Sequence, residues 1–232
     1  MTYPVNMVSL GPGEAGLITW KGLQLLQAAD KIFYPATGSQ SRAFDILTDL
    51  QIPLSRLQAF RVPMSKARSE THAAYRRVAE EVKEAYNEGL HIALVAEGDA
   101  NLYSSSHYIS ELLASERIPV ETVPGIPAFI ACGALAHVHL AKQEEELHIV
   151  PGTITGAEIE RRLSEKRANL VIMKASQCEA SIKEFIAKHP DILLHYFENT
   201  GIAGKEFYSH HPEEIRARSF PYFSLIIIPK QI

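Results

Sequence analysis

The chain has 232 residues, of which 46% are hydrophobic and 22% charged, enough to bury the core of one large domain or two small ones. The net charge of −4 gives no reason to expect nucleic acid or an anionic membrane as a partner. Only two cysteines occur, which argues against a disulfide scaffold, and no apolar run approaches the roughly 20 residues of a membrane helix. We therefore expect a cytoplasmic protein.

The first half of the chain alternates short β-rich segments with helical ones. Thr19 opens the first helical segment as a cap, and Gly89 ends the longest one. This alternation predicts a largely parallel sheet with helices on its faces. Strands are predicted at residues 5–10, 31–34, 91–96 and 120–123, and helices at residues 19–29, 41–50, 69–88, 104–114 and 128–136.

The second half has a different order of elements. Strands are predicted at residues 147–150, 170–174, 193–197, 206–209 and 223–228, and helices at residues 156–164 and 179–188. Because no helix is predicted between the last two strands, we expect them to pair antiparallel within a mixed sheet. We place two α/β domains at residues 1–118 and 119–232.

Three turns follow predicted strands and contain glycine: residues 11–14, 97–100 and 124–128. In an open parallel sheet, ligands bind where the carboxyl ends of the strands meet, and glycine lets the backbone approach a ligand closely. Each turn alone is better explained as an ordinary strand-to-helix connection, which needs Gly and Pro in any case.

The first turn is not a dinucleotide-binding fingerprint. The letters from Gly11 read GPGEAG, and the second predicted strand ends in Tyr34-Pro35 where an acidic residue would be needed. The sequence also contains no GxxxxGK[ST] phosphate loop.

Taken in order, the turns resemble the tetrapyrrole methylase family. The resemblance rests on VSLGPGEAGLITWKGLQLLQAAD (residues 8–30), VAEGDANLYSSS (95–106) and TVPGIPAFIACGALA (122–136), with weaker support from NLVIMKAS (169–176) and ENTGIAGKE (198–206). Within the family, FYPATGSQSRAFDIL (33–47) is most similar to enzymes that methylate C-20 of precorrin-2 or cobalt-factor II in cobalamin (vitamin B12) synthesis.

The resemblance implies two α/β domains with a cleft between them, usually in a homodimer, and S-adenosylmethionine as methyl donor. It implies a tetrapyrrole substrate on the first domain and the donor on the second, with no protein-bound metal, nucleic acid or membrane partner. The donor-binding residues implied by motif are Pro12, Gly98, Asp99, Ala100, Tyr103, Pro127, Ala128, Met173 and Ala203. Two of them depart from the family pattern, since proline commonly follows the aspartate and Thr or Ser commonly stands at the position of Pro127.

Asp99 is the candidate catalytic residue because it lies on the turn nearest the expected methyl group. Methyl transfer from a sulfonium needs no protein nucleophile, but a carboxylate beside the reacting carbon could orient the ring or accept a proton. The alternative is a helix cap or a turn residue.

A basic segment is the candidate wall for the substrate carboxylates. Glu70 is the only acid between Arg56 and Arg77. The alternative is a solvated helix face. The basic residues of this segment are Arg56, Arg61, Lys66, Arg68, Arg76 and Arg77, and Lys21, Arg42 and His107 are further candidates for substrate binding.

Three other functions remain open. The chain could methylate another position of a corrin or uroporphyrinogen ring, or an RNA or protein group on the same fold. An RNA substrate would favour a basic cleft across the chain rather than one basic segment. A non-enzymatic cofactor-binding module is the third, disfavoured by the run of intact motifs.

Overall fold

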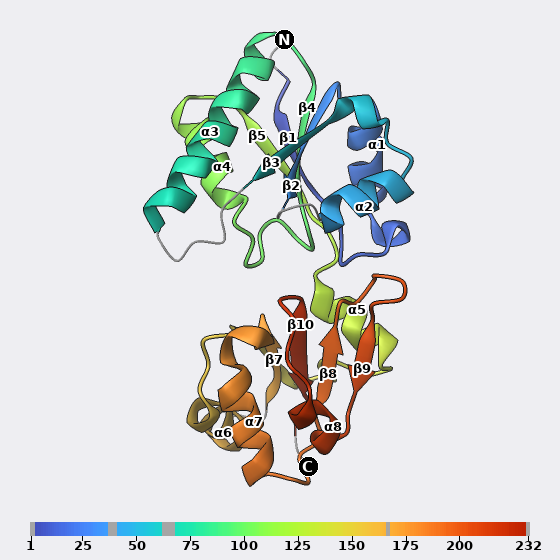
Figure 1. The fold of residues 1–232 in the computed structure, drawn as a ribbon, viewed down its shortest axis with the longest axis vertical. Helices are drawn as coiled ribbons and strands as arrows, with labels where there is room; N and C mark the ends of the chain where they lie inside the picture. The colour runs from blue at the N-terminus through green and yellow to red at the C-terminus, as the bar shows by residue number, and fades with distance from the viewer. Residues whose placement is uncertain (1–2, 37–40, 62–67, 166–167, 231–232) are drawn as a thin grey trace. The chain divides into compact units, whose positions relative to one another are not determined.

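The computed structural model describes residues 3–36, 41–61, 68–165 and 168–230. The chain divides into two compact units, Met1–Pro127 and Ala128–Ile232. Each unit contains one five-stranded sheet with helices packed on it, as Figure 1 shows. This confirms the predicted α/β class.

The first unit contains a fully parallel sheet in the order β3-β2-β4-β1-β5. Its strands are β1 (Val5–Ser9), β2 (Lys31–Ala36), β3 (Leu57–Arg61), β4 (Ile92–Ala96) and β5 (Val120–Val123). Its helices are α1 (Trp20–Ala28), α2 (Arg42–Asp49), α3 (Arg68–Asn87) and α4 (His107–Ser115), with short 3-10 helices at Ala15–Leu17 and Leu54–Arg56.

Helices α1 and α2 cover one face of this sheet, and α3 and α4 cover the other (Figure 1). Successive side chains of a strand point to opposite faces, so β1 contributes to both layers. Met7 packs in the cluster beneath α3 and α4, and its neighbour Val8 packs beneath α1 and α2. Burial on both faces explains why β1 and β4 read as apolar runs.

The second unit contains a mixed sheet in the order β6-β7-β10-β8-β9. Only β6 and β7 are parallel; the other neighbours are antiparallel. Its strands are β6 (Glu146–Pro151), β7 (Ala168–Met173), β8 (His195–Glu198), β9 (Phe207–Ser209) and β10 (Ser224–Ile228). Its helices are α5 (Ala128–Leu135), α6 (Gly156–Glu165), α7 (Glu179–Lys188) and α8 (Pro212–Ala217), with a short 3-10 helix at Ala175–Cys178.

The predicted pairing of the last two strands is wrong. Helix α8 lies between β9 and β10 in the chain, and β10 inserts between β7 and β8. Strand β9 pairs with β8 instead. Strands β9 and β10 both run antiparallel to β8 and so run in the same direction, and the connection through α8 is a crossover past β8.

The division between the units differs from the predicted boundary after residue 118. It falls between Pro127 and Ala128, because β5 pairs with β1 along Val5–Val8 and so belongs to the first sheet. Among the described helices, none has the length and apolar character needed to cross a membrane.

Candidate functional site

The three glycine-containing turns meet at one edge of the first sheet. Strands β4, β1 and β5 are parallel neighbours, so their carboxyl ends lie side by side. Gly11 and Gly98 join the first two turns through paired backbone bonds: the Gly11 N–H donates to the Gly98 carbonyl at 3.1 Å, and the Gly98 N–H donates back at 2.8 Å. Both have positive φ, 83° and 68°, which glycine adopts without strain.

Asp99 joins the second turn to the third. Its Oδ2 accepts the Gly125 N–H at 2.8 Å, and its Oδ1 accepts the Asn101 N–H at 2.8 Å. A Cβ on Gly125 would lie 2.5 Å from the Ser9 Cβ and 2.8 Å from the Gly98 carbonyl oxygen. The third turn therefore approaches the others as closely as a glycine backbone allows.

The predicted donor-binding residues of the first unit lie on these turns, except Tyr103, which follows the second turn. The Ala100 N–H, which a proline would lack, donates to the Ser9 hydroxyl at 2.9 Å. Tyr103 has a left-handed φ of 50° and keeps 39% of its surface exposed. The six residues brought to this edge are Pro12, Gly98, Asp99, Ala100, Tyr103 and Pro127.

Glu97 is a titratable residue of this edge that was not singled out from the sequence. It follows β4 directly, and burial raises the pKa of its carboxyl although Arg42 and the backbone of Ala43 favour the charged form. The Arg42 guanidinium also donates to the Pro12 carbonyl at 2.7 Å. Arg42 therefore links the start of α2 to the first turn and lies near Glu97. An acid directly after an apolar strand was the signal that could have identified it.

The candidate substrate residues have different surroundings. Lys21, on α1, forms an ion pair with Glu121 of β5. Arg61 ends β3 and is exposed, whereas Arg56 donates to the carbonyls of Gln27 and Ala29 and so caps the end of α1. Lys66 lies outside the described residues.

His107 begins α4 within an aromatic cluster on the first unit. Its Nδ1 contacts the Ser104 carbonyl oxygen at 2.8 Å, and its ring centroid lies 3.9 Å from that of Tyr108. Tyr108 also contacts His72 at 5.0 Å and Tyr75 at 5.1 Å between ring centroids. The cluster joins the N-terminal half of α3 to the start of α4, an association that sequence spacing did not predict.

In the second unit, Met173 and Ala203 lie near the same edge of the sheet. Met173 ends β7 opposite Leu225 of β10, and β10 pairs on its other side with β8, which leads into the turn containing Ala203. Lys174 follows with a left-handed φ of 56°, and a Cβ on Gly152 would lie 2.1 Å from the Lys174 carbonyl oxygen. Gly152 is therefore required for the chain to pass beside the backbone of Lys174, the residue after Met173.

Ala128 begins α5, which is tied to the turn after β8. The Cys132 Sγ lies 3.1 Å from the Thr200 Oγ1, and Cys132 is fully buried. Ala203 itself is exposed. The three predicted donor-binding residues of this unit thus come from α5, the end of β7 and the turn after β8.

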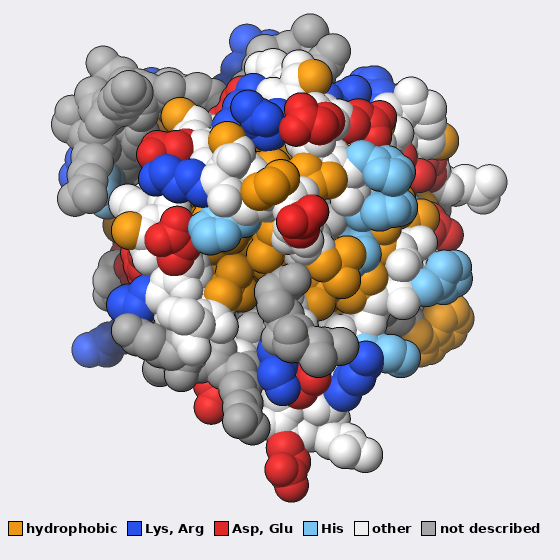
Figure 2. Space-filling view, turned by 90° about the horizontal axis from the view of Figure 1, so that it is seen from below, with side chains coloured by type: hydrophobic (Ala, Val, Ile, Leu, Met, Phe, Trp, Pro, Cys, Tyr) orange, Lys and Arg blue, Asp and Glu red, His pale blue; other side chains and the backbone are white. Residues whose placement is uncertain are grey.

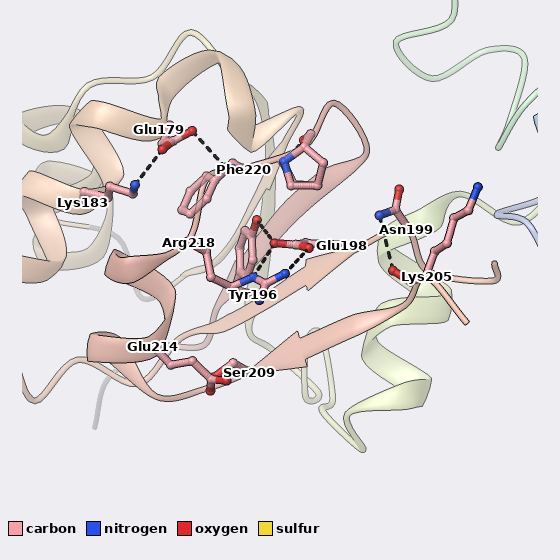
Figure 3. Close-up of polar contacts among 12 residues, drawn as sticks. Glu179, Lys183, Tyr196, Glu198, Asn199, Lys205, Ser209, Glu214, Arg218 and Phe220 are labelled. Carbon is pink, nitrogen blue, oxygen red and sulfur yellow. Dashed lines mark hydrogen bonds and ion pairs between the residues drawn. The ribbon is translucent and has the colours of Figure 1, made fainter. Parts of the chain in front are cut away.

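Figure 3 shows the polar network that fixes the end of β8. The Arg218 guanidinium donates to both carboxylate oxygens of Glu198, each at 2.8 Å, and the Tyr196 hydroxyl donates to Glu198 at 2.7 Å. Burial opposes ionisation of Glu198, but these hydrogen bonds outweigh it and hold the pKa of the carboxyl below its usual value. Arg218 also lies over the Phe207 ring, 3.6 Å from its centroid.

Charges of both signs are interspersed on the face shown in Figure 2, where Lys and Arg side chains lie beside Asp and Glu side chains. Histidine side chains gather toward one side of that face. Within the described residues, no group of three or more His, Cys, Asp or Glu side chains could hold a metal ion.

Comparison with known proteins identifies the class to which this fold and site belong. Residues 4–214 match the family model of tetrapyrrole (corrin/porphyrin) methylases, and the chain belongs to this family. A cobalt-precorrin-2 C(20)-methyltransferase from Salmonella typhimurium is 29% identical over 100% of this chain and 98% of its own length. A precorrin-2 C(20)-methyltransferase from Sinorhizobium sp. is 28% identical over 96% of this chain and 93% of its own length.

The fold is shared with solved structures. A uroporphyrin-III C-methyltransferase from Thermus thermophilus, complexed with S-adenosylhomocysteine, superposes with a TM-score of 0.63 at 19% identity and covers 97% of each chain. This likeness shows the fold, including both sheets, and agrees with the family match.

Proposed function

We propose that this protein transfers a methyl group from S-adenosylmethionine to C-20 of precorrin-2 or its cobalt complex, in cobalamin synthesis. The observation that carries the proposal is the end-to-end similarity to two C(20)-methyltransferases, which spans all three turns and the second unit. One relative is named for cobalt-precorrin-2 and the other for precorrin-2, so substrates with and without cobalt are both candidates.

The reaction depends on the alignment of the reacting atoms more than on acid–base catalysis. The ring carbon attacks the methyl carbon, the bond from methyl to sulfur breaks, and S-adenosylhomocysteine leaves; C-20 then gives up its proton. Positioning can supply about 7–11 kcal/mol of such a barrier in favourable cases. The turns of the first unit are suited to this work, because mutual backbone bonds fix their carbonyl and N–H groups. The residues from α5, β7 and the turn after β8 are proposed to bind the same donor.

Asp99 is proposed to act at this site chiefly by holding the second and third turns together. Both of its oxygens already accept backbone N–H groups, and a carboxylate has further lone pairs that could receive the C-20 proton. A folded Asp99→Ala variant with near-normal turnover would remove Asp99 from the mechanism.

The substrate carboxylates are proposed to meet Arg61, Lys66 and His107, with Lys21 and Arg42 as further contacts. Arg61 supports this best among the described candidates, because it is exposed and is the last residue of β3, at the carboxyl edge of the sheet. Arg61→Glu should raise the KM for the tetrapyrrole and leave the KM for the donor unchanged. Equal effects on the two KM values would count against a role of Arg61 in binding the substrate carboxylates.

We also propose a homodimer in the cytoplasm, with neither nucleic acid nor a membrane as partner. Ile130 and Leu135 of α5 are 44% and 47% exposed, which supplies apolar surface for a second copy. Light scattering after size exclusion should give twice the mass of one chain.

The decisive experiment incubates the purified protein with labelled S-adenosylmethionine and precorrin-2, with and without cobalt. Mass spectrometry and NMR should show one added methyl group at C-20 and identify the preferred metal state. A methyl group at another ring carbon would show that the protein catalyses a different methylation step on the same ring. Donor binding without transfer to any corrin precursor would favour an RNA or protein substrate.

A further inference from the structure

Ser9, the last residue of β1, connects the first turn to the other two through its side chain. It is fully buried, and its hydroxyl accepts the Ala100 N–H at 2.9 Å. Its Cβ occupies the space that a Cβ on Gly125 would need, at a separation of 2.5 Å. One small side chain therefore contacts both the second and the third turn.

The Ala100 N–H depends on this hydroxyl. Residues 99–102 form a β-turn closed by the Leu102 N–H donating to the Asp99 carbonyl at 3.2 Å, and the Asn101 N–H donates to the Asp99 carboxylate. The turn thus satisfies the N–H groups of Asn101 and Leu102 but not that of its second residue, Ala100. Ala100 is only 6% exposed, and a buried N–H without a partner is costly.

We propose that Ser9 is a positioning residue of the methyl-transfer site, acting through the Ala100 N–H to set the second turn against the first and third. Its effect on donor affinity rests on the proposed function; its coupling to Ala100 does not. Ser9 does not touch the reacting atoms in this proposal. It fixes the backbone of the residues expected to line the donor.

Proline at residue 100 provides the test of this coupling. The second position of a β-turn favours proline, which has no N–H. In an Ala100→Pro background residue 100 has no N–H for the Ser9 hydroxyl to accept. Replacing Ser9 with alanine in that background should therefore have little effect on donor binding. Four proteins are compared: the parent chain, Ser9→Ala, Ala100→Pro and the double variant.

Two measurements are made on each protein: the melting temperature, and the Kd for S-adenosylhomocysteine by calorimetry. Ser9→Ala alone should lower the melting temperature by roughly 3–8 °C and weaken binding by about tenfold, the effect of one unsatisfied buried N–H. In the proline background, the same change should alter binding by less than about twofold.

Ser209→Ala is the matched control. Ser209 is also a buried serine whose hydroxyl accepts a backbone N–H, that of His211 at 3.1 Å, but it lies at the end of β9 in the second unit. It should lower the melting temperature and leave the Kd unchanged. If Ser9→Ala behaves in the same way, Ser9 is merely structural and the proposal fails.

Equal losses from Ser9→Ala in both backgrounds would also overturn the proposal, because the Ala100 N–H would then not be the link. If Ala100→Pro does not fold, hydrogen exchange of the Ala100 amide decides: it should be protected in the parent chain and exchange faster in Ser9→Ala, and unchanged protection would refute the coupling. A parent chain that binds no S-adenosylhomocysteine would refute the proposed function, while the melting temperatures would still test the coupling.

Discussion

Gly98 and Gly125 lie on neighbouring turns but are required for different reasons. Gly98 has a φ of +68° with no atom within 4 Å of an added Cβ, whereas an added Cβ on Gly125 would overlap Ser9 and the Gly98 carbonyl. Gly98→Ala should cost about 1–2 kcal/mol of unfolding free energy, the strain of a left-handed alanine. Gly125→Ala should cost about 3 kcal/mol or more, because backbone must move. Urea unfolding measures both, and the reverse order would contradict the close approach of the turns.

Replacing Glu97 should change the way in which the stability of the protein depends on pH. Burial raises the pKa of its carboxyl, so its contribution to stability is fully present below the ordinary carboxyl pKa and is lost as the pH rises through the raised value. Glutamine cannot ionise and avoids that loss. Glu97→Gln should therefore melt at an equal or higher temperature than the parent at pH 7, and the gain should shrink toward pH 4.

The result for Glu97→Gln also bears on function. A variant that gains stability but loses methyl transfer would show that this partly buried acid is retained for the reaction. A clear loss of stability at pH 7 would mean that attraction to Arg42 outweighs the cost of burial, and the predicted direction would be wrong.

At the scale of elements, the long apolar and periodic segments were predictable and the short ones were not. The apolar runs of β1, β4 and β10 were recognised because both faces of these strands are buried. Strand β3 was missed because it lies at the sheet edge with only Phe60 buried. Helix α8 has six residues and buries only Ile215, too few for a 3.6-residue period.

The candidate site shows the same limit. Local motifs predicted the three turns, but the bonds that join them, such as Asp99 to Gly125 and Ser9 to Ala100, connect residues far apart in the chain. The same holds for the contact of Tyr108 with His72. Such partners depend on strand order, which local patterns do not specify.

The pair Glu198–Arg218 connects two elements, because it ties the end of β8 to the residue after α8. Glu198 is 6% exposed at its side chain and Arg218 37%, so removing the charge should cost less than breaking a fully buried pair, about 2 kcal/mol for Glu198→Gln. Chemical unfolding at pH 7 measures the loss. The exposed pair Glu184–Lys188 on α7 is the control, and Glu184→Gln should leave the stability nearly unchanged, because exposed pairs contribute little.

The pH dependence of Glu198 runs opposite to that of Glu97. Its pKa is lowered, so its contribution is present above the ordinary carboxyl pKa and is lost as the pH falls through the lowered value. The difference between Glu198→Gln and the parent should therefore shrink in acid. A difference that stays constant down to low pH would show that packing, not charge, stabilises this end of β8.

At the scale of the whole molecule, each unit has its own buried core and sheet, so each can have its own unfolding transition. The residues proposed to bind the donor are found in both units. S-adenosylhomocysteine at about 100 times its Kd contributes about 2.7 kcal/mol, which should raise the melting temperature by roughly 5–10 °C. If the donor binds both units, scanning calorimetry should show that both transitions move together.

The exposed variant Ala203→Glu should fold normally and reduce the shift in melting temperature. A shift confined to one transition would mean that a single unit binds the donor, and the residues assigned to the other would have to be withdrawn.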